Sequence, residues 1–279
     1  MKKMYLFTIP YEAKKHNIDY SGFDDIPEDT FSSISENFKK LNSAEPLVSI
    51  NIIAWNEEKN ILRTLSSLSE IKSKYPVEVI VVDNNSVDKT SEIIRRCGLT
   101  PVHEKKQGYG FARQAALQAS KGKIILTGDS DTIYLPGWVD AMVKNMVEQK
   151  AIATFGSYAF IPPADTSRFS LAVYEQLRNF NHFFKRISRP HLSVVGMNFG
   201  FLRKDALEIG FVKENIRGED GRMAFELAKR GKVIYISCNN SVVWTHYRSL
   251  RSTGVWDAFK SHAKRELKRL NIYFSKYKE

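Results

Sequence analysis

The residues with the clearest potential for chemistry are two aspartates around one small residue, Asp129-Ser130-Asp131. They directly follow the apolar segment 123–127, which is predicted to be a buried strand. Two neighbouring carboxylates repel each other, and Mg²⁺ or Mn²⁺, which prefer oxygen ligands, would relieve that repulsion. Asp129 and Asp131 therefore fit a divalent-cation site that also holds a diphosphate. Taken alone, the same residues also fit a solvated turn with helix-capping aspartates.

Further polar residues follow other predicted strands. Asn56 and Glu57 come after the apolar run 47–54, and Asp83 comes after the run 77–82. The carboxylate of Asp83 can accept a hydrogen bond from a base N–H or a ribose hydroxyl. Its alternative role is to cap the helix that follows.

A basic, glycine-containing segment, Lys105-Lys106-Gln107-Gly108-Tyr109-Gly110, precedes a predicted helix. Cations and a flexible backbone at a helix N-terminus suit diphosphate binding. Gly108 is the candidate backbone contact, although such a segment also fits a plain turn. Arg113 is predicted to lie one turn into this helix, facing either the cleft or solvent.

The elements that must position these residues alternate between strands and helices. Apolar strands that alternate with helices predict an α/β fold, in which a mixed, mostly parallel sheet is covered on both faces. Ligands bind beyond the carboxyl ends of such strands, so the polar tips should converge on one cleft. The predicted strands are 47–54, 77–82, 100–104 and 123–127, and the predicted helices are 57–68, 88–97, 108–120 and 136–149.

The second half is less regular, with predicted strands at 151–160, 232–236 and 241–245 and helices at 168–189 and 218–230. One side of the helix 168–189 is apolar at helical spacing. This stripe is expected in the core, or else at the border of an acceptor groove. It comprises Phe169, Val173, Leu177, Phe180, Phe184 and Ile187.

The predicted organisation is a polar N-terminal extension over residues 1–45, one compact domain over 46–250, and a basic amphipathic helix over 251–279. A short helix near Phe31–Leu41 is expected within the extension. Length and composition agree, because 279 residues with 43% apolar content can bury a substantial core. The oligomeric state is not predicted.

Cysteine usage and hydropathy bear on location. Cys97 and Cys238 are far apart and match no metal-ligand spacing, which favours reduced thiols and the cytoplasm. No segment approaches the roughly 18 apolar residues that span a bilayer. The protein is therefore expected to be cytoplasmic, either free or peripheral on the inner face of the membrane.

The formal net charge of +11 fits nucleic acid, a membrane surface or a phosphorylated substrate. The chain shows no motif that reads a nucleic-acid groove, so no nucleic-acid partner is expected. Residues 256–279 hold seven basic and three acidic residues. Their apolar residues recur at helical spacing, which suits an anionic membrane surface or packing on the domain. These residues are Trp256, Phe259, Ala263, Leu267 and Leu270.

Taken together, the motifs resemble the inverting family 2 glycosyltransferases, which have the GT-A nucleotide-sugar-binding fold. The resemblance covers roughly Leu47 to Thr245, with the motifs in the expected order and spacing. A glutamine stands at position 114, where asparagine is more usual, and the N-terminal extension is a second departure. The matching segments are 48–58, 81–90, 110–116, 127–132 and 218–220.

The resemblance implies roles for the donor side of the site. Ala54, Asn56 and Glu57 lie where the family wraps the nucleoside, and Asp83 lies where it recognises the base. Asp129 matches the carboxylate near the ribose and the metal.

The resemblance also implies roles around the transferred sugar. Asp131 matches the main metal ligand, and some relatives place a further histidine ligand near His246. The segment containing Gly196 resembles the loop that lines the donor sugar and acceptor. Asp220 matches the catalytic base, with Glu219 beside it. Without the resemblance, these two acids fit a helix N-terminus whose macrodipole they complement.

The implied function is metal-dependent transfer of a sugar from a UDP- or GDP-linked donor to a saccharide or lipid-linked hydroxyl. Inversion and a role in cell-surface polysaccharide or glycoconjugate synthesis are expected. One alternative is a sugar-nucleotide nucleotidyltransferase, although Trp55-Asn56-Glu57-Glu58 replaces the glycine-rich loop of that chemistry. Another is an inactive nucleotide-sugar-binding module, against which the intact carboxylates argue.

Overall fold

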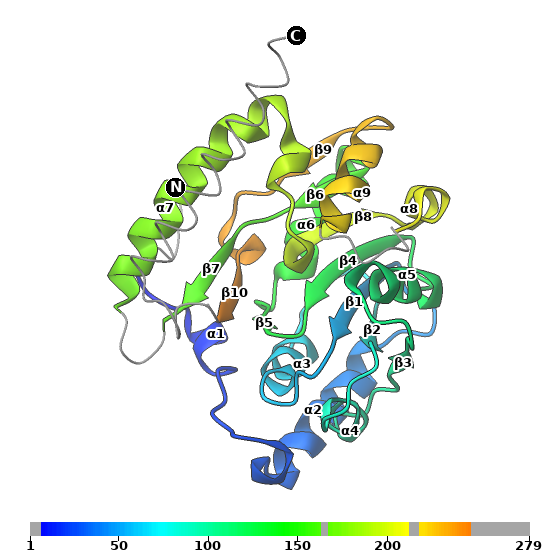
Figure 1. The fold of residues 1–279 in the computed structure, drawn as a ribbon, viewed down its shortest axis with the longest axis vertical. Helices are drawn as coiled ribbons and strands as arrows, with labels where there is room; N and C mark the ends of the chain where they lie inside the picture. The colour runs from blue at the N-terminus through cyan, green and yellow to red at the C-terminus, as the bar shows by residue number, and fades with distance from the viewer. Residues whose placement is uncertain (1–6, 163–166, 212–217, 247–279) are drawn as a thin grey trace.

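The computed structural model describes residues 7–162, 167–211 and 218–246, with the backbone alone for residues 181–188. A seven-stranded mixed sheet has the order β3-β2-β1-β4-β8-β6-β9, and a three-stranded sheet has the order β5-β10-β7. Helices flank the larger sheet (Figure 1). The predicted α/β class with a mostly parallel central sheet is confirmed.

The first half of the chain forms the parallel part of the sheet. β1 lies between β2 and β4 and pairs in parallel with both, and every residue of β1 is buried. The register places Ala54 opposite Asp83 and Ile53 opposite Asp129. The polar tips of three strands therefore meet at one edge of the sheet. The elements are β1 (Val48–Ala54), α3 (Ile61–Ser69), β2 (Val77–Asp83), α4 (Thr90–Arg96), β3 (Val102–His103), α5 (Tyr109–Ala119) and β4 (Ile124–Asp129).

The second half completes both sheets. β8 runs antiparallel to β4 and β6, and β9 pairs in parallel with β6. The single strand predicted over 151–160 is two strands, because the chain leaves the large sheet at Gly156 and enters the small sheet at Tyr158. The elements are β5 (Thr132–Ile133), α6 (Trp138–Glu148), β6 (Ala153–Phe155), β7 (Tyr158–Ile161), α7 (Arg168–Ser188), β8 (Phe199–Leu202), α8 (Arg203–Ile209), α9 (Glu219–Ala228), β9 (Val233–Tyr235) and β10 (Val243–His246).

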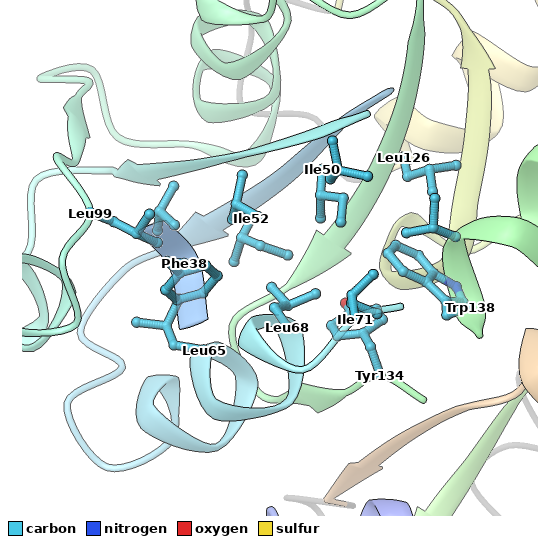
Figure 2. Close-up of a cluster of buried hydrophobic side chains, with 14 of the residues drawn as sticks. Phe38, Ile50, Ile52, Leu65, Leu68, Ile71, Leu99, Leu126, Tyr134 and Trp138 are labelled. Atoms are coloured by element: carbon cyan, nitrogen blue, oxygen red, sulfur yellow. The ribbon is translucent and has the colours of Figure 1, made fainter. Parts of the chain in front are cut away.

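The main core lies between the large sheet and the helices on one face. Figure 2 shows Ile50, Ile52 and Leu126 of the sheet beside Leu65 of α3 and Trp138 of α6. All of these side chains are fully buried. Burying such a side chain contributes about 1.5–3 kcal/mol, so this layer fixes the strand ends that carry the site.

The N-terminal residues are part of this core. After α1 (Tyr11–Lys14) and η1 (Phe23–Asp25), the helix expected near 31–41 is present as α2 (Glu28–Leu41). Phe31, Ile34 and Phe38 of α2 are buried in the main core. The backbone N–H of Val79 donates to Asn42 Oδ1 at 2.9 Å, just after α2. Residues 28–42 therefore pack as a structural layer on the sheet.

The expectation that the apolar stripe of α7 is core is wrong for its described side chains. Glu175 and Arg178 are buried on the opposite side of the helix, where they make specific polar contacts with the domain. Phe184 and Ile187 lie outside the described side chains, and the predicted helix over 251–279 lies outside the described residues. Four stripe residues are exposed: Phe169, Val173, Leu177 and Phe180.

Within the part of the chain that the structure describes, no helix combines the length and apolarity needed to cross a bilayer.

Candidate active site

The loops after β1 and β2 are tied together at the edge of the sheet. Asn56, which has a φ of 52°, donates its backbone N–H to Ser86 Oγ at 2.9 Å. The backbone N–H of Val87 donates to Asn56 Oδ1 at 2.9 Å, and that of Glu57 donates to Thr90 Oγ1 at 2.8 Å. These side-chain bonds replace strand pairing where the strands end, so the two loops form one rigid wall.

A cleft of about 600 Å³ opens at this wall, within the usual range for small-molecule sites. Its lining combines the ends of β1 and β4 with the start of α5. Most predicted donor-binding and metal residues line it, namely Ala54, Asn56, Glu57, Gly108, Asp129 and Asp131.

Two aromatic residues on the cleft were missed as site residues by the sequence reasoning. Trp55 and Tyr109 line the cleft with 52% and 55% of their surface exposed. Exposed aromatic faces in a cleft can stack on a nucleobase. Their positions, directly after β1 and at the start of α5, could have predicted that they line the cleft.

Asn84 was a further omission. It is buried, and its Nδ2 donates to the carbonyl oxygens of Glu104 at 3.0 Å and Lys106 at 2.7 Å. Its Oδ1 accepts from the backbone N–H of Gly108 at 2.8 Å. Gly108 has a φ of 147°, a conformation that favours glycine. Asn84 thus shapes the loop that leads into α5.

Asp83 is buried and is absent from the cleft lining. Its Oδ1 accepts from the backbone N–H of Ser86 at 3.0 Å, and its Oδ2 accepts from Ser91 Oγ. His103 Nδ1 is 3.7 Å from Oδ2. The carboxylate therefore stabilises its own loop, and recognition of a base by Asp83 stays a prediction.

The Asp129–Asp131 turn joins β4 to β5. The backbone N–H of Asp129 donates to Tyr134 Oη at 3.0 Å, and Thr245 Oγ1 donates to the backbone carbonyl of Asp131 at 3.2 Å. Both carboxylate-bearing residues line the cleft and are partly exposed. Mg²⁺ commonly uses one or two carboxylates together with substrate phosphates, so these two residues fit such a cation.

His246 follows Thr245 at the end of β10, and its Nε2 is 2.8 Å from Asn17 Oδ1. In the described ranges, no group of three His, Cys, Asp or Glu residues is arranged to hold a metal ion. A metal role for His246 stays a prediction.

Arg113 faces neither the open cleft nor solvent, contrary to the expectation, because it is buried next to Asp129. Its Nη1 donates to the carbonyl of Gly128 at 2.8 Å, and its Nη2 donates to Asp129 Oδ1 at 2.7 Å. Its Nε lies 3.5 Å from Asp220 Oδ1. Burial opposes the charged guanidinium, but the facing carboxylates of Asp220 and Asp129 outweigh it and raise the pKa of Arg113.

Asp220 lies in the first turn of α9, with 16% of its side chain exposed. Burial raises its pKa from 3.8 to about 6, although Arg113 opposes this shift. Among the described residues, Asp220 Oδ1 accepts no hydrogen bond. A carboxylate with a pKa just below neutrality suits proton abstraction at pH 7. The neighbouring Glu219 is buried, and its Oε2 accepts from the backbone N–H of Gly218 at 2.9 Å.

Gly196 begins η3 (Gly196–Asn198) and brings this loop against the Arg113–Asp220 pair. A Cβ on Gly196 would overlap Asp220 Oδ2 and lie 2.6 Å from Arg113 Nη2, so a larger residue here would displace one or both side chains. Thr127 Oγ1 at the end of β4 donates to the Gly196 carbonyl at 2.7 Å and holds the loop in place.

Gln114, the residue that departs from the family pattern, serves another contact. Its Oε1 accepts from the backbone N–H of Phe211 at 2.8 Å. Gln114 is absent from the cleft lining, so the substitution leaves the described cleft wall unchanged.

Comparison with solved structures shows the same fold. A mannosyltransferase from Pyrobaculum calidifontis, solved with GDP-Man and Mn²⁺, has a TM-score of 0.56 at 19% identity, covering 84% of this chain and 67% of that one. Glucosyl-3-phosphoglycerate synthase from Mycobacterium tuberculosis, solved with Mn²⁺, UDP-glucose and phosphoglyceric acid, has a TM-score of 0.53 at 18% identity, covering 81% and 79%. Both similarities describe the GT-A fold.

Sequence comparison identifies the family. An uncharacterised protein of Methanocaldococcus jannaschii is 27% identical over 205 residues, 66% of this chain and 82% of that protein. Glycosyltransferase AglE of Haloferax volcanii is 32% identical over 115 residues, 38% of this chain and 37% of its own length. The family model described as glycosyl transferase family 2 matches residues 49–210, more than half of the chain. The chain therefore belongs to glycosyltransferase family 2 and is an enzyme that transfers a sugar from a nucleotide sugar.

Proposed function

We propose that the enzyme uses Mn²⁺ or Mg²⁺ to transfer a hexose from a UDP- or GDP-linked donor to a hydroxyl of a saccharide or lipid-linked acceptor, with inversion. The expected role is in cell-surface polysaccharide or glycoconjugate synthesis. The observation that carries this proposal is the buried guanidinium of Arg113, which contacts both Asp129 and Asp220. One side chain thus joins the metal motif to a carboxylate suited to act as a base.

The donor nucleoside would lie along the wall formed by Ala54, Asn56 and Glu57, with its base between or beside Trp55 and Tyr109. These residues share one cleft with the metal motif. The diphosphate would approach the start of α5 just after Gly108, because the first N–H groups of a helix have no partner within the helix.

Asp129 and Asp131 would hold the divalent cation at the cleft end of β4. When bound, the cation neutralises the negative charge that develops on the departing diphosphate. Asp129 lines the cleft and its Oδ1 accepts from Arg113 Nη2 at 2.7 Å, so its other oxygen would be left for the cation.

Asp220 would accept the proton of the acceptor hydroxyl. As the oxygen attacks the anomeric carbon, a new C–O bond forms and the bond from that carbon to the diphosphate oxygen breaks. A single displacement of this kind inverts the anomeric configuration. The positive charge of Arg113 lowers the pKa of Asp220 and so favours the ionised form that the reaction needs.

The relatives support the donor and acceptor classes. The solved neighbours bind GDP-Man or UDP-glucose with Mn²⁺. A dolichyl-phosphate hexose transferase of Haloferax volcanii is 34% identical over 90 residues, 31% of this chain and 39% of that protein.

Calorimetric titration of the full chain with UDP and GDP, with Mn²⁺ and after chelation, tests the proposal. Binding of one nucleotide is expected to require the metal. Asp131→Asn should abolish that dependence, whereas Asp29→Asn, an exposed acid on α2, should bind as the wild type does. Nucleotide binding that is absent, or equal with and without metal, would contradict the proposal.

A further inference from the structure

The apolar side of α7 is exposed, and its buried side carries charged residues. An amphipathic helix normally turns its apolar side to the domain. Here Phe169, Val173, Leu177 and Phe180, the α7 apolar stripe, are exposed by 63%, 44%, 51% and 67%. α7 lies at an edge of the molecule and contacts β7 (Figure 1).

Specific polar contacts fix this orientation. Glu175 is buried and accepts from Arg168 Nη2 at 2.8 Å and from the backbone N–H of Phe160 at 2.7 Å. Arg178 Nη2 donates to the carbonyl of Tyr158 at 2.5 Å, and its guanidinium lies 3.7 Å from the centre of the Tyr158 ring. Rotating α7 to bury the stripe would break these contacts. The charges of Glu175 and Arg178 would then be exposed, or buried without their partners.

The charged residues of α7 and the residue that follows it are almost all basic. Glu175 is the only acidic residue between positions 168 and 189, and it is buried in an ion pair. Lys185, Arg186 and Arg189 follow the stripe along the chain, and the whole chain carries a net charge of +11. An exposed apolar stripe on a helix with no exposed carboxylate of its own, followed in the sequence by three basic residues, suits an anionic lipid surface.

We propose that the α7 apolar stripe docks on an anionic lipid bilayer, with α7 lying in the interface. From Phe169 to Phe180 the stripe is about 17 Å long. Aromatic and aliphatic side chains exposed to this extent offer roughly 400 Å² in total. This area is about half of what one partner buries in a standard protein–protein interface. A helix that lies in a membrane interface needs only one narrow apolar side, which the stripe provides.

Lipid docking would also orient the active site. At its C-terminal end α7 contacts η2 (Pro190–Ser193), which packs on α9, the helix that carries Asp220. The acceptor side would therefore lie close to the bilayer surface. This orientation rests on the proposed role of Asp220, whereas docking itself does not, so each can fail separately.

Co-sedimentation of the full chain with vesicles tests the proposal. Vesicles of equal parts phosphatidylcholine and phosphatidylglycerol are compared with phosphatidylcholine alone. Leu177→Glu is compared with Gln176→Glu, because Gln176 is exposed on the same turn at the border of the stripe and is itself polar. Both variants add the same charge, and thermal unfolding checks that both fold. Val173→Glu repeats the test at a second stripe position.

The wild type is expected to bind the anionic vesicles. Gln176→Glu should weaken partitioning about fivefold, from roughly 1 kcal/mol per charge near the surface. Leu177→Glu should weaken it roughly tenfold further, because it also removes an apolar anchor. Equal losses in the two variants, or no binding to anionic vesicles, would overturn the proposal. A dimer in light scattering that Leu177→Glu dissociates would also overturn it, by assigning the stripe to a second copy.

Discussion

Replacing Arg113 by glutamine removes the buried positive charge between Asp129 and Asp220. The guanidinium Nε lies 3.5 Å from Asp220 Oδ1, and Asp220 has a pKa of about 6 in its presence. If Asp220 is the base, activity should rise with pH through this pKa, because only the ionised carboxylate accepts a proton. Loss of Arg113 should shift that rise to higher pH.

The size of the shift follows from the geometry. Coulomb's law at 3.5 Å with an effective dielectric constant of about 20 gives roughly 5 kcal/mol as an upper bound. A carboxyl group next to an arginine typically has its pKa lowered by about 1–3 units. In Arg113→Gln the pKa of Asp220 should therefore reach about 7–9. With a pKa of about 8, roughly one tenth of Asp220 is ionised at pH 7, so turnover falls about tenfold there.

The assay measures nucleotide release from a donor that binds, between pH 5 and about 9.5, at saturating donor and Mn²⁺. Partial recovery of Arg113→Gln at high pH distinguishes a pKa effect from general damage. The pH midpoint of Arg113→Lys should lie between those of the wild type and Arg113→Gln, because lysine keeps the charge but not the forked geometry of the guanidinium. Arg222→Gln is the matched control, since Arg222 lies on α9 but donates to the carbonyl of Gly210 at 2.5 Å. An unchanged pH midpoint in Arg113→Gln would refute the reasoning.

Further predictions concern stability, the acceptor loop and the cleft. Because the pKa of Asp220 is raised in the folded state, ionisation of Asp220 lowers the free energy of unfolding by about 3 kcal/mol as pH rises from about 4 to about 6. Asp220→Asn should remove this loss, which urea unfolding at pH 4.5 and about 7.5 would measure. Gly196→Ala should lower turnover at least about tenfold by displacing Asp220, whereas Gly221→Ala, where an added Cβ meets nothing within 4 Å, should not. Phe38→Ala should cost about 3–5 kcal/mol in denaturant unfolding, against little for the exposed Val87→Ala; a small cost would contradict the structural role of α2. Trp55→Ala should weaken nucleotide binding by about 1–3 kcal/mol in calorimetry, while Tyr11→Ala, outside the cleft, should leave it unchanged.

The strand ends were predictable because their signal is local. The apolar run that became β1 is buried along its whole length, and parallel pairing then aligns Ala54 with Asp83. Asp129 and Asp131 reach the same edge for the same reason. Continuous apolar runs and polar tips are therefore enough to predict a convergent cleft.

The buried position of Arg113 was not predictable in this way. A charged residue one turn into a helix is ordinarily exposed, and its burial depends on two carboxylates supplied by other elements. Asp129 comes from β4 and Asp220 from α9, so the neutralising contacts exist only in the folded chain. The role of Asn84 in holding the loop before Gly108 likewise depends on tertiary contacts.

The error at α7 has a different cause. Helical spacing shows that a helix is amphipathic, but it does not show which side faces the domain. Glu175 and Arg178 reversed the expected orientation because each found specific partners in the small sheet and its surroundings. The ion pair and hydrogen bonds of Glu175, with the hydrogen bond and ring contact of Arg178, thus outweigh the apolar stripe.

In the proposed mechanism, the metal motif binds the donor and Asp220 separately accepts the proton of the acceptor. The most direct test is to measure both properties in Asp220→Asn, with the nucleotide sugar that binds most tightly and an acceptor that supports nucleotide release by the wild type. Metal-dependent donor affinity is expected to stay within about threefold of the wild type, while turnover falls by at least about a hundredfold. Turnover near the wild-type level in Asp220→Asn would contradict the account.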